Sequence, residues 1–200
     1  MASGDLMKHE IARADLLSVS EYVKVRKERR AEIVAIKKNR RLEVGPFATF
    51  YFECRETMWL QIQEMLYIEK GGEEQIQGEL DAYNPLIPKG SELVATVMFE
   101  IDDPLRRARV LARLGGVEET GFIEIGGERI RGVPEADQDR TNAEGKASSV
   151  QFLRFPFAAT QISRFRTSGT QVLVGFDHPD YGHLAVMPEQ VREALARDFA

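Results

Sequence analysis

The chain has 200 residues, of which 43% are hydrophobic, and a formal net charge of −5. We predict a single domain over residues 1–200, because a chain of this length buries about 70% of its unfolded surface and needs no disulfide or metal to hold a core. The single cysteine excludes an internal disulfide and any CxxC motif, and no apolar run reaches the roughly 18 residues of a membrane-spanning helix. Residues 1–10 are too polar for a signal peptide, so we expect a cytoplasmic protein with a flexible start.

The first predicted element is a long N-terminal helix. Ser18 and Glu21 have the spacing of a capping box, in which each side chain satisfies a free backbone N–H group at the other residue. The helix runs to about Lys38, and two short strands follow it around a turn at Gly45 and Pro46. Periodicity and turn residues then predict helices over 57–69 and 73–83, a strand over 93–101, a helix over 104–114, and strands over 122–125 and 128–133.

Residues 134–148 are polar and rich in turn formers, and they predict a long loop, which in a compact domain is commonly mobile or functional. The remaining predicted elements are a strand over 150–155, a helix over 158–166, strands over 172–176 and 184–187, and a terminal helix from Pro188. Hairpin signals outnumber the spacing of βαβ units. The predicted fold class is therefore α+β, with a mainly antiparallel sheet, helices packed against it and a long N-terminal helix.

Basic charge is concentrated in one segment of the chain. Between Lys24 and Arg41, nine Lys or Arg residues stand against two glutamates, so this segment carries +7 and the rest of the chain −12. Such a split is typical of a surface for nucleic acid or an acidic partner, and equally of a solvated helix. Nucleic acid is the less favoured partner, because nucleic-acid binders are usually basic over the whole domain.

Charged residues also fall on the apolar stripes of two predicted helices. Arg26 and Arg29 lie within the stripe that Tyr22 and Ile33 form on the first helix, and Glu69 lies among apolar residues of the second. An unpaired buried charge is very costly, so we expect these groups to meet, directly or through an acidic ligand. The pattern predicts a buried ion pair or anion site made of Arg26, Arg29 and Glu69. The alternative is that the arginine stems lie on the core with their heads in water.

Two histidines form a second constellation near the C-terminus. A four-residue hairpin loop between His178 and His183 would place their Cβ atoms about 4.5–5.5 Å apart on neighbouring strands. Such a pair can share one divalent metal ion, with Asp180, Glu53 or Glu100 as further ligands. The alternative is a turn that exposes two histidines without a metal.

No established catalytic motif occurs in the sequence. The P-loop, GxGxxG, GxSxG and HExxH patterns are absent. Cys54 lies near the start of a helix, where the pKa of a thiol can fall, but no histidine is close in sequence and a lone cysteine is typical of buried packing. The sequence therefore names no catalytic residue and leaves open whether the protein is an enzyme.

Several stretches form a set between about Ile11 and Asp198: RRLEVGP (40–46), FE (52–53), QEML (63–66), ELDAYNPLIP (79–88), KASSVQF (146–152) and DHP (177–179). In order and spacing this set resembles a bacterial family that carries one domain of unknown function. The resemblance implies that the gene lies near genes for rubrerythrin and an iron–sulfur oxidoreductase. This neighbourhood in turn implies a role in peroxide or redox defence, with these two proteins as partners. The resemblance implies no catalytic residue.

Three functions are consistent with these observations. The first is a non-catalytic accessory or binding protein in redox defence, which the resemblance and the absence of motifs favour. The second is a metal-binding protein or metal-dependent enzyme built on the histidine pair and carboxylates. The third is a nucleic-acid-binding protein that uses the basic helix.

Overall fold

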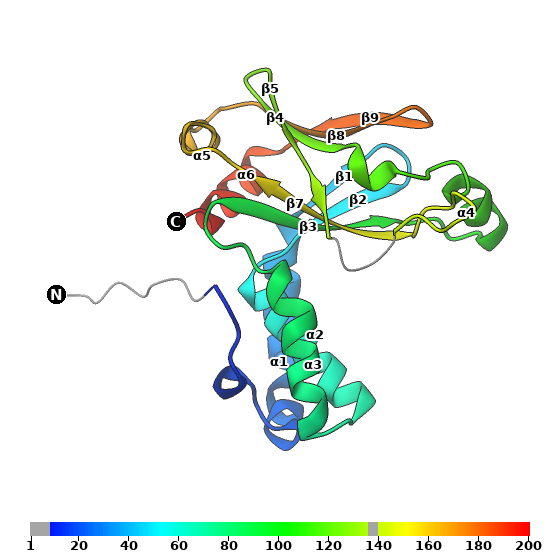
Figure 1. Ribbon diagram of the computed structural model, residues 1–200. Coiled ribbons are helices and arrows are strands. Elements are labelled where there is room, and N and C mark those ends of the chain that lie inside the picture. Colours follow the sequence, from blue (N-terminus) through cyan, green and yellow to red (C-terminus); the bar gives the residue numbers. More distant parts are fainter. Residues whose placement is uncertain (1–8, 136–139) are drawn as a thin grey trace.

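The computed structural model describes residues 9–135 and 140–200. In it two antiparallel sheets face each other, and three helices form an arm that projects away from them (Figure 1). Sheet A has the strand order β1-β2-β3-β7-β6, and sheet B has the order β5-β4-β8-β9. The predicted α+β class with antiparallel pairing is confirmed, with the difference that the strands divide into two sheets.

The strands of sheet A are β1 (Arg41–Val44), β2 (Ala48–Phe52), β3 (Glu92–Phe99), β6 (Val133–Pro134) and β7 (Val150–Pro156). Those of sheet B are β4 (Gly121–Ile125), β5 (Glu128–Arg131), β8 (Val172–His178) and β9 (Tyr181–Val186). The helices are α1 (Val19–Lys38), α2 (Arg55–Glu69), α3 (Glu73–Tyr83), α4 (Pro104–Leu111), α5 (Ala159–Arg166) and α6 (Glu189–Leu195). Short 3-10 turns are η1 (Arg13–Asp15), η2 (Asn84–Leu86), η3 (Val117–Glu119) and η4 (Ala196–Asp198).

The main core lies between the two sheets. Side chains alternate along a strand, so Phe50 and Phe52 of β2 face sheet B while Tyr51 between them faces outward. The ring centres of Phe50 and Phe176, one from each sheet, are 5.2 Å apart. Burying one such side chain contributes about 1.5–3 kcal/mol, and the cluster contains most of the molecule's phenylalanines, which makes it the main source of stability.

The chain passes from one sheet to the other at Gly132. The sequence predicted one strand over 128–133, but β5 pairs with β4 in sheet B and β6 pairs with β7 in sheet A. A Cβ atom at Gly132 would lie 3.0 Å from the Phe155 ring, so the crossing needs a residue without a side chain.

The arm consists of α1, α2 and α3 (Figure 1). Its first helix begins as predicted, because the Glu21 N–H donates to Ser18 Oγ and the Ser18 N–H donates to the Glu21 carboxylate. A second apolar cluster packs α2 and α3 against the segment before α1 and against Val94 on the outer face of β3. The arm is thereby attached to the outer face of sheet A.

Two predicted segments fall partly outside the described residues. Of the predicted flexible start, residues 1–8 lie outside them, and of the predicted loop 134–148, residues 136–139 do. The rest of that loop is more regular than predicted, since Pro134 belongs to β6 and Thr141 forms an isolated β-bridge with Ala147. In the described ranges, no helix combines the length and the apolar character needed to cross a membrane.

Candidate functional site

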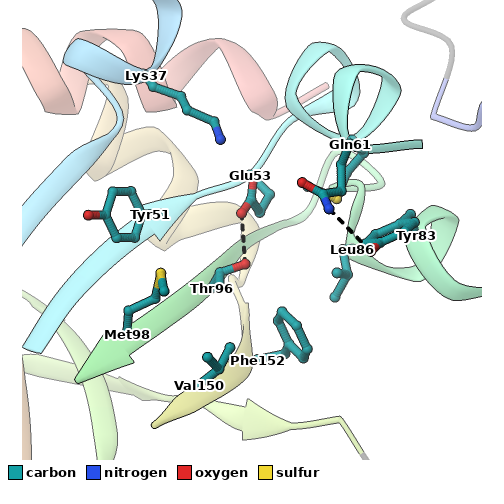
Figure 2. Close-up of a pocket in the computed structure, with 11 residues that line it drawn as sticks. Lys37, Tyr51, Glu53, Gln61, Tyr83, Leu86, Thr96, Met98, Val150 and Phe152 are labelled. Atoms are coloured by element: carbon teal, nitrogen blue, oxygen red, sulfur yellow. Dashed lines mark hydrogen bonds between the residues drawn. The ribbon is translucent and has the colours of Figure 1, made fainter. Parts of the chain in front are cut away.

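A pocket of about 280 Å³ lies between the arm and the outer face of sheet A (Figure 2). Its polar lining residues are Lys37, Tyr51, Glu53, Gln61, Tyr83 and Thr96. Its apolar lining residues are Met58, Leu86, Met98, Val150 and Phe152. Helices α1, α2 and the end of α3 form one side, and strands β2, β3 and β7 form the other.

The alternation of side chains along the strands builds the floor of this pocket. The core-facing residues of β2 alternate with Tyr51 and, just after the strand, Glu53. Tyr51 lies directly opposite Thr96 of β3, and Thr96 lies opposite Phe152 of β7. Cross-strand neighbours point to the same face, so three strands together supply polar and aromatic groups to one surface.

Glu53 is the buried polar group of the pocket. It is only 6% exposed, and its carboxylate accepts hydrogen bonds from Thr96 Oγ1 at 2.7 Å and Thr57 Oγ1 at 2.6 Å. Each oxygen thus has one hydroxyl partner and a further lone pair. The Glu53 N–H also donates to the Val94 carbonyl at 2.8 Å, which continues the sheet pairing past the end of β2. The side chain is held firmly at the floor.

A buried arginine holds the backbone on which Glu53 stands. The Arg40 guanidinium donates to the carbonyls of Phe52 and Glu53, both at 2.9 Å, and forms an ion pair with Asp198. Burial raises the pKa of the Asp198 carboxyl, and the charge of Arg40 opposes that effect. The next residue, Cys54, is buried too, and burial raises the pKa of its thiol to about 11. Cys54 is therefore a packing residue, not an activated thiol.

The rim of the pocket is more polar than its walls. The Tyr51 hydroxyl donates to Glu100 at 2.8 Å, and Thr49 donates to the other oxygen of the same carboxylate at 2.7 Å. Burial and this contact with Glu100 raise the pKa of Tyr51. The exposed Lys37, on the last turn of α1, extends toward the side of the pocket that Glu53 occupies (Figure 2).

The predicted histidine hairpin is wrong in its register. The turn between β8 and β9 has two residues, not four, so His178 lies opposite Tyr181 and His183 lies opposite Phe176. His178 is buried, with Nε2 lying 3.1 Å from the Gly115 carbonyl and Nδ1 accepting from the Asp180 N–H at 3.1 Å. Nδ1 is therefore engaged within the turn, and Nε2 is engaged by the segment between α4 and η3.

The predicted metal ligands do not converge. His183 is exposed, with its ring 4.6 Å from that of Tyr181, whereas Glu53 and Glu100 lie on the outer face of sheet A. Within residues 9–135 and 140–200, no group of three or more His, Cys, Asp or Glu residues is arranged to hold a metal ion. The four predicted ligands His178, His183, Glu53 and Glu100 are separated because they come from different faces of the two sheets.

The predicted pairing of Arg26 and Arg29 with Glu69 is also corrected. Arg26 forms a two-point ion pair with Glu64, with both N–O distances 2.8 Å, and the Tyr22 hydroxyl donates to the same carboxylate. Arg29 is exposed and pairs with Glu32 on its own helix, 2.9 Å away. Glu69 is exposed and accepts from Gln75 of α3.

The reason lies in the two faces of α2. The apolar stripe that contains Glu69 faces α3 and the segment before α1, whereas α1 meets the face that carries Trp59, Glu64 and Tyr67. The Arg26 guanidinium lies over the Tyr67 ring, 4.6 Å from its centre. The sequence pattern indicated that Arg26 needs a charged partner, but it did not show which face of α2 provides that partner.

The remaining basic residues of α1 are mostly solvated. Only Tyr22 and Ile33 are fully buried on this helix, and Lys24, Lys27 and Arg30 are exposed. This matches the solvated-helix alternative for the basic segment. Nucleic-acid binding stays a prediction that the sequence disfavours.

Of the pocket residues, only Glu53 was predicted from the sequence to belong to a site, and that site was a metal site. The sequence did not point to Thr57, Thr96, Lys37 or Phe152. A usable signal was the polar alternation of Thr49, Tyr51 and Glu53 between buried aromatic residues, which marks an outer sheet face with more polar groups than a packed face would carry.

Comparison with known proteins places the chain in a family. A crystal structure described as a novel protein of unknown function from Burkholderia pseudomallei K96243 is similar to it, with a TM-score of 0.87 and 36% sequence identity over 95% of this chain and 99% of that chain. No curated protein matches the chain. The expected resemblance to a family with a domain of unknown function is confirmed, because the family model described as "Protein of unknown function (DUF3501)" matches residues 10–199. The chain therefore belongs to this family.

Proposed function

We propose that the protein is a non-catalytic binding protein that holds a small organic molecule in the Glu53 pocket. The observation that carries the proposal is a buried carboxylate on the floor of a pocket with largely apolar walls. Ligand sites characteristically combine apolar walls with a few fixed polar groups, which determine the orientation of the ligand.

The complementary ligand group is a positively charged hydrogen-bond donor. Glu53 accepts one hydrogen bond at each carboxylate oxygen and keeps lone pairs for a further donor. Its partners Thr57 and Thr96 belong to α2 and β3, so the carboxylate is fixed before a ligand arrives. An ammonium group that enters the pocket gains a charge-assisted hydrogen bond without having to order the side chain.

Binding without catalysis fits the groups that surround the pocket. Cys54 is buried, and the raised pKa of its thiol keeps it protonated at neutral pH. His178 ends β8 in sheet B, and its two ring nitrogens are engaged by Gly115 and Asp180. Within the described ranges, the pocket lining offers one buried carboxylate and no histidine or cysteine beside it.

The experiment is a titration of the isotope-labelled protein with isopentylamine, followed by NMR. We expect chemical-shift changes at Thr96, Met98 and Phe152, and their loss in Glu53→Gln, which removes the charge at nearly the same volume. Glu43→Gln on the exposed part of β1 is the matched control and should bind like the wild type. Shifts spread over other surfaces, or shifts unchanged by Glu53→Gln, would contradict the proposal.

The pathway part of the proposal is peroxide or redox defence, with rubrerythrin or an iron–sulfur oxidoreductase as the protein partner. What supports it is the gene neighbourhood that the family resemblance implies. Biolayer interferometry with the two proteins from the same bacterium tests it. Micromolar or tighter binding to either is the expected result, and no measurable binding to both would remove this part while leaving the pocket proposal intact.

A further inference from the structure

The pocket carries two opposite charges that do not neutralise each other. The Glu53 carboxylate is buried at the floor, and the Lys37 ammonium belongs to an exposed side chain of the same pocket. The two groups form no ion pair with each other, and each borders the space between α1 and sheet A (Figure 2). A molecule in that space can contact both.

The third element is an apolar wall opposite Lys37. Figure 2 shows Phe152 and Val150 on the side of the pocket away from Lys37, with Glu53 between. Met58 and Leu86 extend this wall at the base of the arm. A short hydrocarbon group fits against these residues and leaves the polar groups to the ligand's charged end.

The volume limits the size of the ligand. At about 30 Å³ for each water in the liquid, 280 Å³ corresponds to about nine water molecules, and hence to a compound of about nine non-hydrogen atoms. A nucleotide or a peptide of several residues would extend out of a pocket of this size. The volume fits a molecule with two charged groups on one or two carbons and a branched or aromatic side chain.

We infer that the pocket takes a free apolar α-amino acid, with the ammonium at Glu53, the carboxylate at Lys37 and the side chain on the Phe152 wall. The inference rests on the proposed function and adds the second charge and the size limit. A simple amine lacks the group that Lys37 binds. A simple carboxylic acid of the same shape can contact Lys37 but lacks the ammonium group that Glu53 binds.

The two recognition groups should differ in strength. Glu53 is buried and fixed, so its loss removes a charge-assisted hydrogen bond and should weaken binding by roughly tenfold to a hundredfold. Lys37 is exposed and screened by water, so its loss should weaken binding by about twofold to fivefold. The carboxylate contact therefore adds selectivity more than affinity.

The test compares three compounds of nearly equal shape by calorimetric titration: L-leucine, isopentylamine, which lacks the carboxylate, and 4-methylpentanoic acid, which lacks the ammonium. For the wild type we expect leucine to bind more tightly than isopentylamine, and the acid not to bind measurably. Lys37→Met should bring leucine down to the affinity of the amine. The neighbouring exposed Lys38→Met is the matched control and should leave the order unchanged.

The outcomes separate this inference from the proposed function. If isopentylamine binds the wild type as tightly as leucine does, and Lys37→Met changes neither, the two-charge inference is wrong while the pocket function stands. If no amine-bearing compound binds, or if Glu53→Gln binds like the wild type, both fail. Lys37 is a surface residue, so its variant keeps the test valid even where Glu53→Gln is unstable.

Discussion

The position of Glu53 depends on Arg40, a residue that does not line the pocket. The Arg40 guanidinium donates hydrogen bonds to the carbonyls of Phe52 and Glu53 and forms an ion pair with Asp198 near the end of the chain. Both partners of this ion pair are at least nine-tenths buried. A buried pair of this kind contributes little net stability, but removing one partner leaves the other charge uncompensated.

We therefore predict that Arg40→Met lowers the free energy of unfolding by about 3–5 kcal/mol, because Asp198 is left buried and charged. The double variant Arg40→Met, Asp198→Leu should recover much of that loss. Urea unfolding at neutral pH measures both. The matched control is Arg41→Met, the next residue, whose exposed pair with Glu43 should contribute at most about 1 kcal/mol. Equal losses from Arg40→Met and Arg41→Met would show that Arg40 does not act through Asp198.

At the scale of elements, the arm is held together along one line of contact. The helix α1 buries little apolar surface, so its attachment to α2 relies on Tyr22 and on the Arg26–Glu64 ion pair beneath it. The hydrogen bonds from Arg26, reinforced by Tyr22 and opposed by partial burial, hold the pKa of Glu64 below its ordinary value of 4.5. The folded state therefore favours the ionised carboxylate.

The consequence for pH follows from the direction of that shift. A carboxyl whose pKa is lower in the folded state stabilises the protein above its unfolded pKa, and the contribution is lost as the pH falls below about 4.5 through the folded value. We expect Glu64→Gln to be less stable than the wild type by about 1–2 kcal/mol at neutral pH, with the difference shrinking below that pH. Urea unfolding over a pH series measures it. Glu32→Gln, from the exposed pair of α1, is the control and should follow the wild-type curve closely.

At the scale of the molecule, β3 joins the two apolar clusters. Leu93, Ala95 and Val97 face the core between the sheets, and Val94 faces the arm from the other side of the same strand. A strand shared in this way couples the arm to the sheets. That the chain forms one domain stays a prediction.

Cooperative unfolding tests that coupling. The single tryptophan, Trp59, lies in the arm, so its fluorescence follows the arm while near-ultraviolet circular dichroism follows the aromatic cluster between the sheets as well. We predict that the two signals change at the same urea concentration. Loss of the tryptophan signal at a clearly lower concentration would mean that the arm unfolds alone and that the one-domain prediction is wrong.

Most elements could be predicted from local patterns, because capping residues, glycine turns and alternation are properties of neighbouring residues. The Ser18 cap occurs as expected. Asp103 caps the helix that was predicted to begin at 104, and Gly126 and Gly127 form the turn between two predicted strands. The division into two sheets could not be predicted, since it depends on which strands pair across distant parts of the chain. At Gly132 only the crowding by Phe155 shows that the chain changes sheets.

The site was harder to predict for the same reason. His178 and His183 are separated by four residues, but the length of the turn between them decides which residue lies opposite each. The two-residue turn shifts the register, so the histidines are not direct cross-strand partners. Glu64 and Glu69 are both on α2, and only the packing of α3 decides which of them meets α1. The Glu53 pocket joins residues 37 to 152, and no motif covers such a span.

The pairing of β3 with β7 also determines how the chain must fold in time. Met98 pairs with Val150, so more than fifty residues, including all of β4 and β5, separate the two partners. Loop-closure entropy must be overcome before such contacts stabilise anything, and proteins dominated by distant pairings fold in milliseconds to seconds, whereas helical bundles fold faster. The helical arm is made of near neighbours and can form early, but its docking surface on sheet A exists only after β3 and β7 have met. The Glu53 pocket is thus expected to be one of the last parts of the molecule to become complete.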